Sequence, residues 1–274
     1  MKNLGMPYQG SKNKIATQIV EHFPPADTFV DLFFGGGAVT HAAMLSGKFH
    51  NFLANDLRKT PQAWNRAVEG IGNEYDRFVS KEEFLASDDM IVKMIWSFGS
   101  SCKSYAVTGI HELAARMIMS DSVEGRYSAW LKFLKIVEAR GSNGLYDCAQ
   151  HVHAVTTLRW LKDLRGNSPV TPSNIDYREV EIPKDSVVYA DPPYKGTAQY
   201  DNRFDHDAFW KWCRTREFPV YISEQEAPDD FVQIFSIQKV ISFTRSSGWK
   251  RNEGLFLHKK WAQEPAKPGA GLES

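Results

Sequence analysis

Short runs of apolar residues along the chain predict the strands of a buried β-sheet. Residues 28–33 (TFVDLF) and 52–56 (FLAND) read as strands, and residues 186–190 (SVVYA) form a continuous run of this kind. A continuous apolar run of this length, bounded by turn residues, indicates a strand covered on both faces. The second run ends at Asp56, and Asp191 follows the third directly. Acids at these positions lie at the carboxyl ends of strands, where open α/β sheets bind ligands.

Helical spacing of apolar residues accompanies these strands. Ile15, Ile19 and Phe23 repeat at helical intervals and predict a helix over residues 14–21, while residues 38–45 form a helix-like run after the first strand. Residues 58–170 also carry helical periodicity, with four tryptophans and no second glycine turn. The pattern therefore predicts an α/β fold interrupted by a mainly helical insertion.

The first strand leads through three glycines, residues 35–37, into the helix-like run. Strand, glycine turn and helix form a nucleotide-binding layout, because glycine permits a tight turn and close approach of a ligand. The spacing is not G-x-G-x-x-G, and no basic residue follows to meet a pyrophosphate. A cofactor without phosphates fits better, and Asp56 stands where an acceptor binds ribose hydroxyls. A tight structural turn would give the same local pattern.

The stretch 191–194 (DPPY) carries the clearest chemistry. The carboxylate of Asp191 and the backbone carbonyl of Pro192 can each accept an N–H bond from the exocyclic amine of a nucleobase. Such bonds localise the lone pair of the nitrogen, and the ring of Tyr194 can stack on the base. The stretch predicts methyl transfer onto nucleic acid, although a proline turn after a strand is the simpler reading.

Two motifs give the chain a family resemblance. Residues 31–37 (DLFFGGG) resemble the F-x-G-x-G motif of S-adenosylmethionine-dependent methyltransferases, and residues 191–194 resemble their D-P-P-Y motif. The order of the parts is similar to that of the Dam-like (D12 class) DNA adenine methylases, whose opening motif matches residues 8–12 (YQGSK). The resemblance spans residues 5–60 and 174–258 and implies a class I methyltransferase fold with a Rossmann-like sheet and helices on both faces.

The resemblance also implies a set of site residues. Lys12 would pair with the carboxylate of the cofactor, and Asp176 would accept its adenine amine. Lys12 could equally be an exposed lysine before a helix, and Asp31 could cap or brace the glycine turn. The implied catalytic residues are Asp191, Pro192 and Tyr194. The implied residues for binding S-adenosylmethionine are Tyr8, Lys12, Phe33, Gly35, Gly37, Asp56, Asp176 and Asp191.

The pattern and the resemblance together divide the chain into three parts. Residues 1–57 and 171–262 would form the catalytic domain, and residues 58–170 the helical target-recognition insertion. Residues 263–274, rich in Pro, Gly and Ala, are expected to be a disordered tail.

Charge distribution supports a nucleic-acid partner although the net charge is zero. Residues 239–261 contain six basic residues against one acid, and residues 246–251 (SSGWKR) read as a mobile basic loop suited to phosphates. A solvated hairpin tip is the alternative. The candidate residues for contact with double-stranded DNA are Lys250 and Arg251, together with Arg126 and Lys132 of the insertion.

Composition narrows the class of protein further. The chain has 274 residues, 42% of them hydrophobic, which is enough to bury a substantial core. It shows no apolar run of membrane-spanning length and no signal-peptide pattern, so we expect a cytoplasmic protein without a membrane partner. Its three cysteines suggest neither a disulfide framework nor a metal site, and none is expected. Monomer and weak dimer both stay open.

These observations together predict a site-specific DNA methyltransferase that modifies the exocyclic N6 of a flipped-out adenine. Three alternatives remain: the same chemistry on cytosine, RNA adenine or a protein glutamine; a DNA-binding module without turnover; and a nicotinamide-dependent oxidoreductase. Asp191, as the first residue of the DPPY stretch, favours adenine as the target. The glycine spacing disfavours a nicotinamide cofactor.

Overall fold

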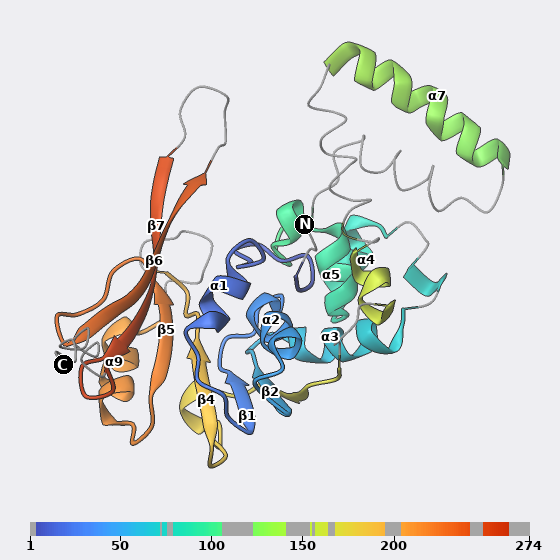
Figure 1. The fold of residues 1–274 in the computed structure, drawn as a ribbon. Coiled ribbons are helices and arrows are strands. Elements are labelled where there is room, and N and C mark those ends of the chain that lie inside the picture. The colour runs from blue at the N-terminus through green and yellow to red at the C-terminus, as the bar shows by residue number, and fades with distance from the viewer. Residues whose placement is uncertain are drawn as a thin grey trace, which may run out of the picture.

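The computed structural model describes residues 4–71, 73–75, 79–105, 123–140, 154, 157–163, 168–194, 204–241 and 249–262. A seven-stranded sheet with the order β3-β2-β1-β4-β5-β7-β6 organises this part of the chain (Figure 1). The strands are β1 (Thr28–Asp31), β2 (Asn51–Asn55), β3 (Thr171–Ser173), β4 (Ser186–Ala190), β5 (Val220–Glu224), β6 (Phe231–Ile241) and β7 (Trp249–His258).

The sheet is parallel from β3 to β5, and β7 inserts antiparallel between β5 and β6. Strand β1 pairs with both β2 and β4, so the carboxyl ends of these three strands lie side by side. The predicted α/β fold is confirmed. It places the ends of β1, β2 and β4, where the glycine turn, Asp56 and Asp191 follow, at one edge.

Helices cover both faces of the sheet. Adjacent strand residues point to opposite faces, so Phe29 packs in the cluster with α1 (Ala16–Glu21) and α2 (Ala38–Ser46), whereas Val30 packs in the cluster with α9 (His206–Thr215). Tyr189 and Val188 of β4 divide in the same way. Burial on both faces explains why these strands appear in the sequence as continuous apolar runs.

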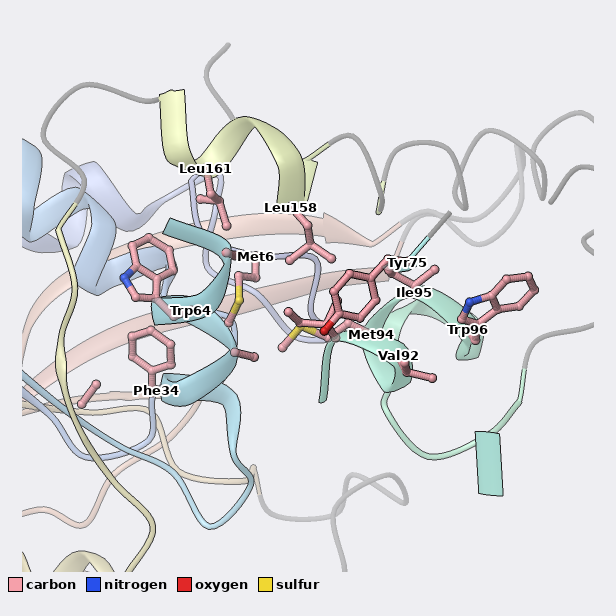
Figure 2. Packing of buried hydrophobic residues seen from close by; sticks show 14 of the residues in the cluster. Met6, Phe34, Trp64, Tyr75, Val92, Met94, Ile95, Trp96, Leu158 and Leu161 are labelled. Carbon is pink, nitrogen blue, oxygen red and sulfur yellow. The ribbon is translucent and has the colours of Figure 1, made fainter. Parts of the chain in front are cut away.

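A third cluster joins the helices after residue 58 to Met6, Phe34 and Ala54 (Figure 2). Trp64 of α3 is fully buried and packs edge-on against Phe34, with ring centroids 5.9 Å apart. The helices here are α3 (Thr60–Glu69), α4 (Lys81–Ala86), α5 (Met90–Trp96) and α7 (Val123–Arg140), with 3-10 turns η1 (Asn73–Tyr75), η2 (Phe98–Ser100), η3 (Leu161–Asp163) and η4 (Tyr177–Glu179). The domain boundary at residue 58 stays a prediction. Helix α3 packs against residues before this boundary through the contact of Trp64 with Phe34.

The strands match the sequence prediction closely, since β4 has the predicted bounds and β1 and β2 differ by one or two residues. One expectation was wrong. The sequence predicted Lys250 and Arg251 in a basic loop between strands, but both residues belong to β7. Lys250 pairs with Val240 and Arg251 with Lys239, because the β6–β7 ladder continues beyond the rest of the sheet (Figure 1).

Some predictions fall on residues that the structure does not describe, including residues 246–248 of the basic segment and the tail 263–274. Within the described residues, no helix has the length and apolar character needed to cross a bilayer.

Candidate active site

A cavity of about 530 Å³ opens at the carboxyl ends of β1, β2 and β4. Residues from the N-terminal segment, the glycine turn, η4 and the end of β4 line it. The predicted site residues that it brings together are Tyr8, Lys12, Phe33, Gly35, Asp56, Asp176 and Asp191. Gly37, Pro192 and Tyr194 lie outside the lining. The cavity therefore unites segments that are up to 200 residues apart in the sequence, from Tyr8 to Ala208.

The glycine turn forms one wall of the cavity and packs closely against Tyr8. Gly35 has φ +52°, and a Cβ atom built there would lie 3.1 Å from Cε1 of Tyr8. At Gly36 a Cβ would meet the Cβ of Tyr8 at 2.7 Å. Gly37 begins α2 with φ +70° and donates its N–H to the carbonyl of Phe34 at 2.7 Å. The role of Gly37 is thus to shape the turn.

Asp56 fixes the turn from the neighbouring strand. Its Oδ2 accepts the N–H of Gly35 and its Oδ1 accepts the N–H of Arg58, both at 2.8 Å. Burial raises the pKa of Asp56, and these two hydrogen bonds oppose that rise. Arg58, which the sequence analysis missed, donates to the hydroxyl of Tyr8 and to the carbonyl of Ser101, each at 3.1 Å. Arg58 therefore ties the N-terminal wall to the loop after η2.

Asp31 braces the same turn from β1. Its carboxylate accepts the hydroxyl of Thr40 at 2.7 Å and the N–H of Phe33 at 3.3 Å. Complete burial raises its pKa to about 7, with the nearby charge of Asp191 adding to the rise. These hydrogen bonds support the interpretation of Asp31 as a residue that braces the glycine turn. Asp31 also borders the cavity.

The far wall consists of aromatic side chains and Asp176. The ring of Phe33 lies 5.4 Å from that of Tyr177 and 5.7 Å from that of Phe204. Asp176 caps η4 and binds the guanidinium of Arg178 through two bonds of 2.7 Å. The hydrogen bond from Arg178 holds the pKa of Asp176 below its usual range. An apolar ring face and an anionic acceptor thus stand together here.

Asp191, at the end of β4, forms a buried ion pair with Lys12. The Nζ of Lys12 lies 2.7 Å from Oδ1 and 2.6 Å from Oδ2, and it lies 3.5 Å from Oε1 of Glu253. Burial raises the pKa of Asp191, Lys12 lowers it, and the charge of Glu253 raises it again. The hydroxyl of Tyr194 donates to Glu253, and the ammonium of Lys12 lies 4.8 Å from the centroid of the Tyr194 ring.

Two further buried polar groups flank this network. Burial raises the pKa of Glu224, at the end of β5, to about 8, and the charges of Asp191 and Glu253 contribute. Its Oε1 accepts the N–H of Gln225 at 2.9 Å, while Oε2 has no hydrogen-bond partner among the described residues. The hydroxyls of Tyr189 and Ser223 are 2.8 Å apart.

The sequence carries a family signature over the wall of this cavity. Residues 8–86 match the D12 class N6 adenine-specific DNA methyltransferases. The similarity covers 79 of the 274 residues. The matched segment contains Tyr8, Lys12, the glycine turn and Asp56, and it ends well before Asp191.

The other comparisons add nothing to this similarity. A search of curated proteins gave no significant match. Among solved structures, the rRNA methyltransferase aviRa from Streptomyces viridochromogenes is similar at 12% identity, over 89% of this chain and 84% of that one, with a TM-score of 0.36. Nothing about substrate or activity follows from a similarity of this size.

Arg58 and Glu253 are the site residues that the sequence analysis missed. Arg58 and Glu253 are isolated charged residues next to recognised motifs, so their partners could not be identified from local pattern. Glu253 is nevertheless the single acid of β7 and directly precedes its apolar residues 254–257, and a buried acid is unusual in a strand.

The DNA-binding candidates lie on two elements of the fold. Lys132 is exposed on α7, which also contains Arg126, whereas Lys250 and Arg251 belong to β7. Lys132 is not among the described residues that line the cavity. Their contact with DNA stays a prediction.

Proposed function

We propose that the chain transfers a methyl group from S-adenosylmethionine to the exocyclic N6 of a flipped-out adenine at specific sites in duplex DNA. The observation that carries this proposal is the position of Asp191. Its carboxylate borders the same cavity as the glycine turn, so an acceptor for an amine and a pocket for a nucleoside cofactor share one space.

The lining suits S-adenosylmethionine. The turn at Gly35 and Gly36 leaves room for backbone approach only, since a Cβ would meet Tyr8. Asp56 would accept ribose hydroxyls, Asp176 would accept the adenine amine, and Phe33 would stack on the adenine ring. When bound, the cofactor supplies an electrophilic methyl group. A cavity of this volume is in the usual range for sites of small molecules and cofactors.

Asp191 would act on the target base. Its carboxylate and the carbonyl of Pro192 would accept the two N–H bonds of the adenine amine and hold the nitrogen lone pair toward the methyl group. Positioning of this kind supplies a large part of the acceleration in a displacement reaction. The base must leave the duplex, because the amine of a stacked and paired base cannot reach the cavity.

Lys12 would keep Asp191 in place during this step. The ammonium holds both carboxylate oxygens, which fixes the rotamer of Asp191 in the absence of substrate. After methyl transfer the nitrogen carries an extra proton. Asp191 would accept it, and the pKa of this carboxyl, raised by burial, suits that role.

The test is transfer of tritium from labelled S-adenosylmethionine to mixed-sequence duplex DNA, followed by nucleoside analysis. We expect label in N6-methyldeoxyadenosine with the wild-type protein and a loss of at least about 100-fold with Asp191→Ala. The exposed Asp229→Ala variant serves as the matched control. Label in methylcytosine, or only with RNA, would reject the adenine-DNA assignment, and full activity of Asp191→Ala would reject the role of the carboxylate.

A further inference from the structure

Glu253 lies behind the cavity wall and contacts both Tyr194 and Lys12. Its side chain is almost completely buried on β7, where the residue pairs with Ile237 of β6. It accepts the hydroxyl of Tyr194 and lies 3.5 Å from the ammonium of Lys12. Nothing in the proposed chemistry requires a second carboxylate at this place, so its presence needs a reason.

The Lys12 group, which consists of Lys12, Asp191 and Glu253, holds more negative than positive charge. One ammonium, that of Lys12, faces two carboxylates, and the shorter contacts go to Asp191. Other acids on the cavity have their own basic partners: Arg178 binds Asp176, and the charge of Arg58 acts on Asp56. The Lys12 group therefore carries one unit of negative charge in excess.

The remaining titratable neighbours add no positive charge at neutral pH, so the balance stays negative. Glu224 faces the group from β5, and burial raises its pKa to about 8, which leaves it mostly uncharged. Asp31 faces Asp191 from β1 with a pKa of about 7. The hydroxyls of Tyr189 and Tyr194 have pKa values raised well above the usual value by burial, and both stay neutral.

Excess charge in a buried site is unfavourable unless an opposite charge is close. The cavity next to Lys12 and Asp191 is where the cofactor would bind. The sulfonium of S-adenosylmethionine is a cation, whereas the thioether of the product S-adenosylhomocysteine is neutral. The charge of the ligand, and not only its shape, then decides how well it fits.

We propose that Glu253 gives the Lys12–Asp191 pair a net negative charge that favours the sulfonium cofactor over the neutral product. Glu253 is on this view a specificity-determining residue that acts through Lys12 and Asp191. The inference rests on the proposed function. It explains why a carboxylate is buried beside an ion pair that is already complete, and it provides a means of product release, because loss of the ligand charge removes the attraction.

The experiment is calorimetric titration of the full chain with S-adenosylmethionine, S-adenosylhomocysteine and sinefungin, an analogue with a charged amine. Glu253→Gln removes the charge but retains an acceptor for Tyr194. We expect this variant to bind S-adenosylmethionine and sinefungin on the order of tenfold more weakly, with binding of S-adenosylhomocysteine almost unchanged. In the wild-type protein, sinefungin should bind more tightly than S-adenosylhomocysteine, and this comparison needs no variant.

Two matched variants separate charge from packing. Glu224→Gln alters a neighbouring buried acid that is mostly uncharged, and Tyr194→Phe removes the hydrogen bond to Glu253 while the charge stays. Both should keep the wild-type ratio of the two affinities within about twofold. An unchanged ratio in Glu253→Gln, or an equal loss in Tyr194→Phe, would overturn the inference alone. Failure of the wild-type protein to bind either adenosyl ligand would overturn the proposed function and the inference together.

Discussion

Lys12 and Asp191 form a buried ion pair although 179 residues separate them in the sequence. Both oxygens of the carboxylate lie within 2.7 Å of the ammonium, and the side chain of Lys12 is only 6% exposed. The pair joins the N-terminal segment to the end of β4 across the cavity. Glu253, 3.5 Å away, makes the ammonium a shared partner of two acids.

Replacing Lys12 by methionine should destabilise the fold strongly. The change leaves Asp191 and Glu253 buried beside an apolar side chain, and removal of one partner of a buried ion pair costs about 3–5 kcal/mol. The two carboxyls would then take up protons more readily, so the loss should be greater at pH 8 than at pH 5. Thermal unfolding at the two pH values measures both effects.

Lys14→Met is the matched control for this variant, because Lys14 lies two residues away and is exposed. We expect its midpoint of unfolding to stay within a few degrees of wild type. An equally small effect of Lys12→Met would show that the ammonium contributes nothing to the stability of the carboxylates.

The two glycines at the ends of α2 offer a second test. Gly37 and Gly47 have nearly equal φ values of +70° and +68°. A Cβ at Gly37 would lie 2.3 Å from Cζ of Phe34, whose ring is packed against Trp64, whereas a Cβ at Gly47 meets nothing within 4 Å. Gly47→Ala should therefore cost about 1 kcal/mol from backbone strain alone, and Gly37→Ala about 1–3 kcal/mol more.

Denaturant unfolding of the two alanine variants measures this difference directly. The clash at Gly37 also pushes on the turn that lines the cavity, so its cofactor affinity should fall while that of Gly47→Ala is retained. Equal losses of stability would mean that Phe34 moves aside without cost.

Local pattern was sufficient to predict the sheet and the cavity wall. The apolar run before Asp191 became β4 with the predicted bounds, because a strand buried on both faces leaves a continuous signature in the sequence. The same holds for the turn at Gly35 and for Asp56 at the end of β2, since a parallel sheet brings neighbouring carboxyl ends together. These features depend on residues that are close in the sequence or on adjacent strands.

Contacts between distant segments could not be predicted in this way. The structure places Lys12 on Asp191 and Glu253, contacts that the local sequence pattern did not indicate, and its contact with the carboxylate of the cofactor stays a prediction. The partner of Glu253 depends on how β7 is inserted between β5 and β6, and no local pattern specifies that order. The predicted basic loop failed for a related reason, because the length of the β6–β7 ladder is set by pairing between the two strands.

The buried carboxyl of Glu224 predicts a pH dependence of stability. Its pKa in the fold is about 8 against a usual value of 4.5, so the folded state holds a proton that the unfolded state has released. The resulting stability is complete below pH of about 4.5 and is lost as the pH rises through about 8. Glu224→Gln cannot ionise, and it should lose about 3 kcal/mol less than wild type between pH 5 and pH 8.

Denaturant unfolding of wild type and Glu224→Gln at both pH values checks this. Glu226→Gln, two residues away and exposed, is the control and should follow the wild-type curve. Asp230, whose pKa Arg214 lowers to about 2, contributes only in acid and leaves this window unaffected. Parallel curves for wild type and Glu224→Gln would reject a protonated carboxyl at this position.

The basic residues at the start of β7 predict a change in the salt dependence of DNA binding. Lys250 and Arg251 begin the strand near the end of the long β6–β7 hairpin (Figure 1). Removing one ion pair with a phosphate makes the slope of log K against log salt shallower by about 0.9, so Lys250→Ala with Arg251→Ala should reduce it by about 2. Binding of labelled duplex at several salt concentrations gives the slope.

Lys184→Ala with Lys211→Ala is the control, because it removes the same number of charges from exposed positions. Lys184 precedes the amino end of β4, and this variant should leave the slope unchanged. A wild-type slope in the Lys250 and Arg251 variant would place the phosphate-binding residues on another surface, with Lys132 on α7 the next to be replaced.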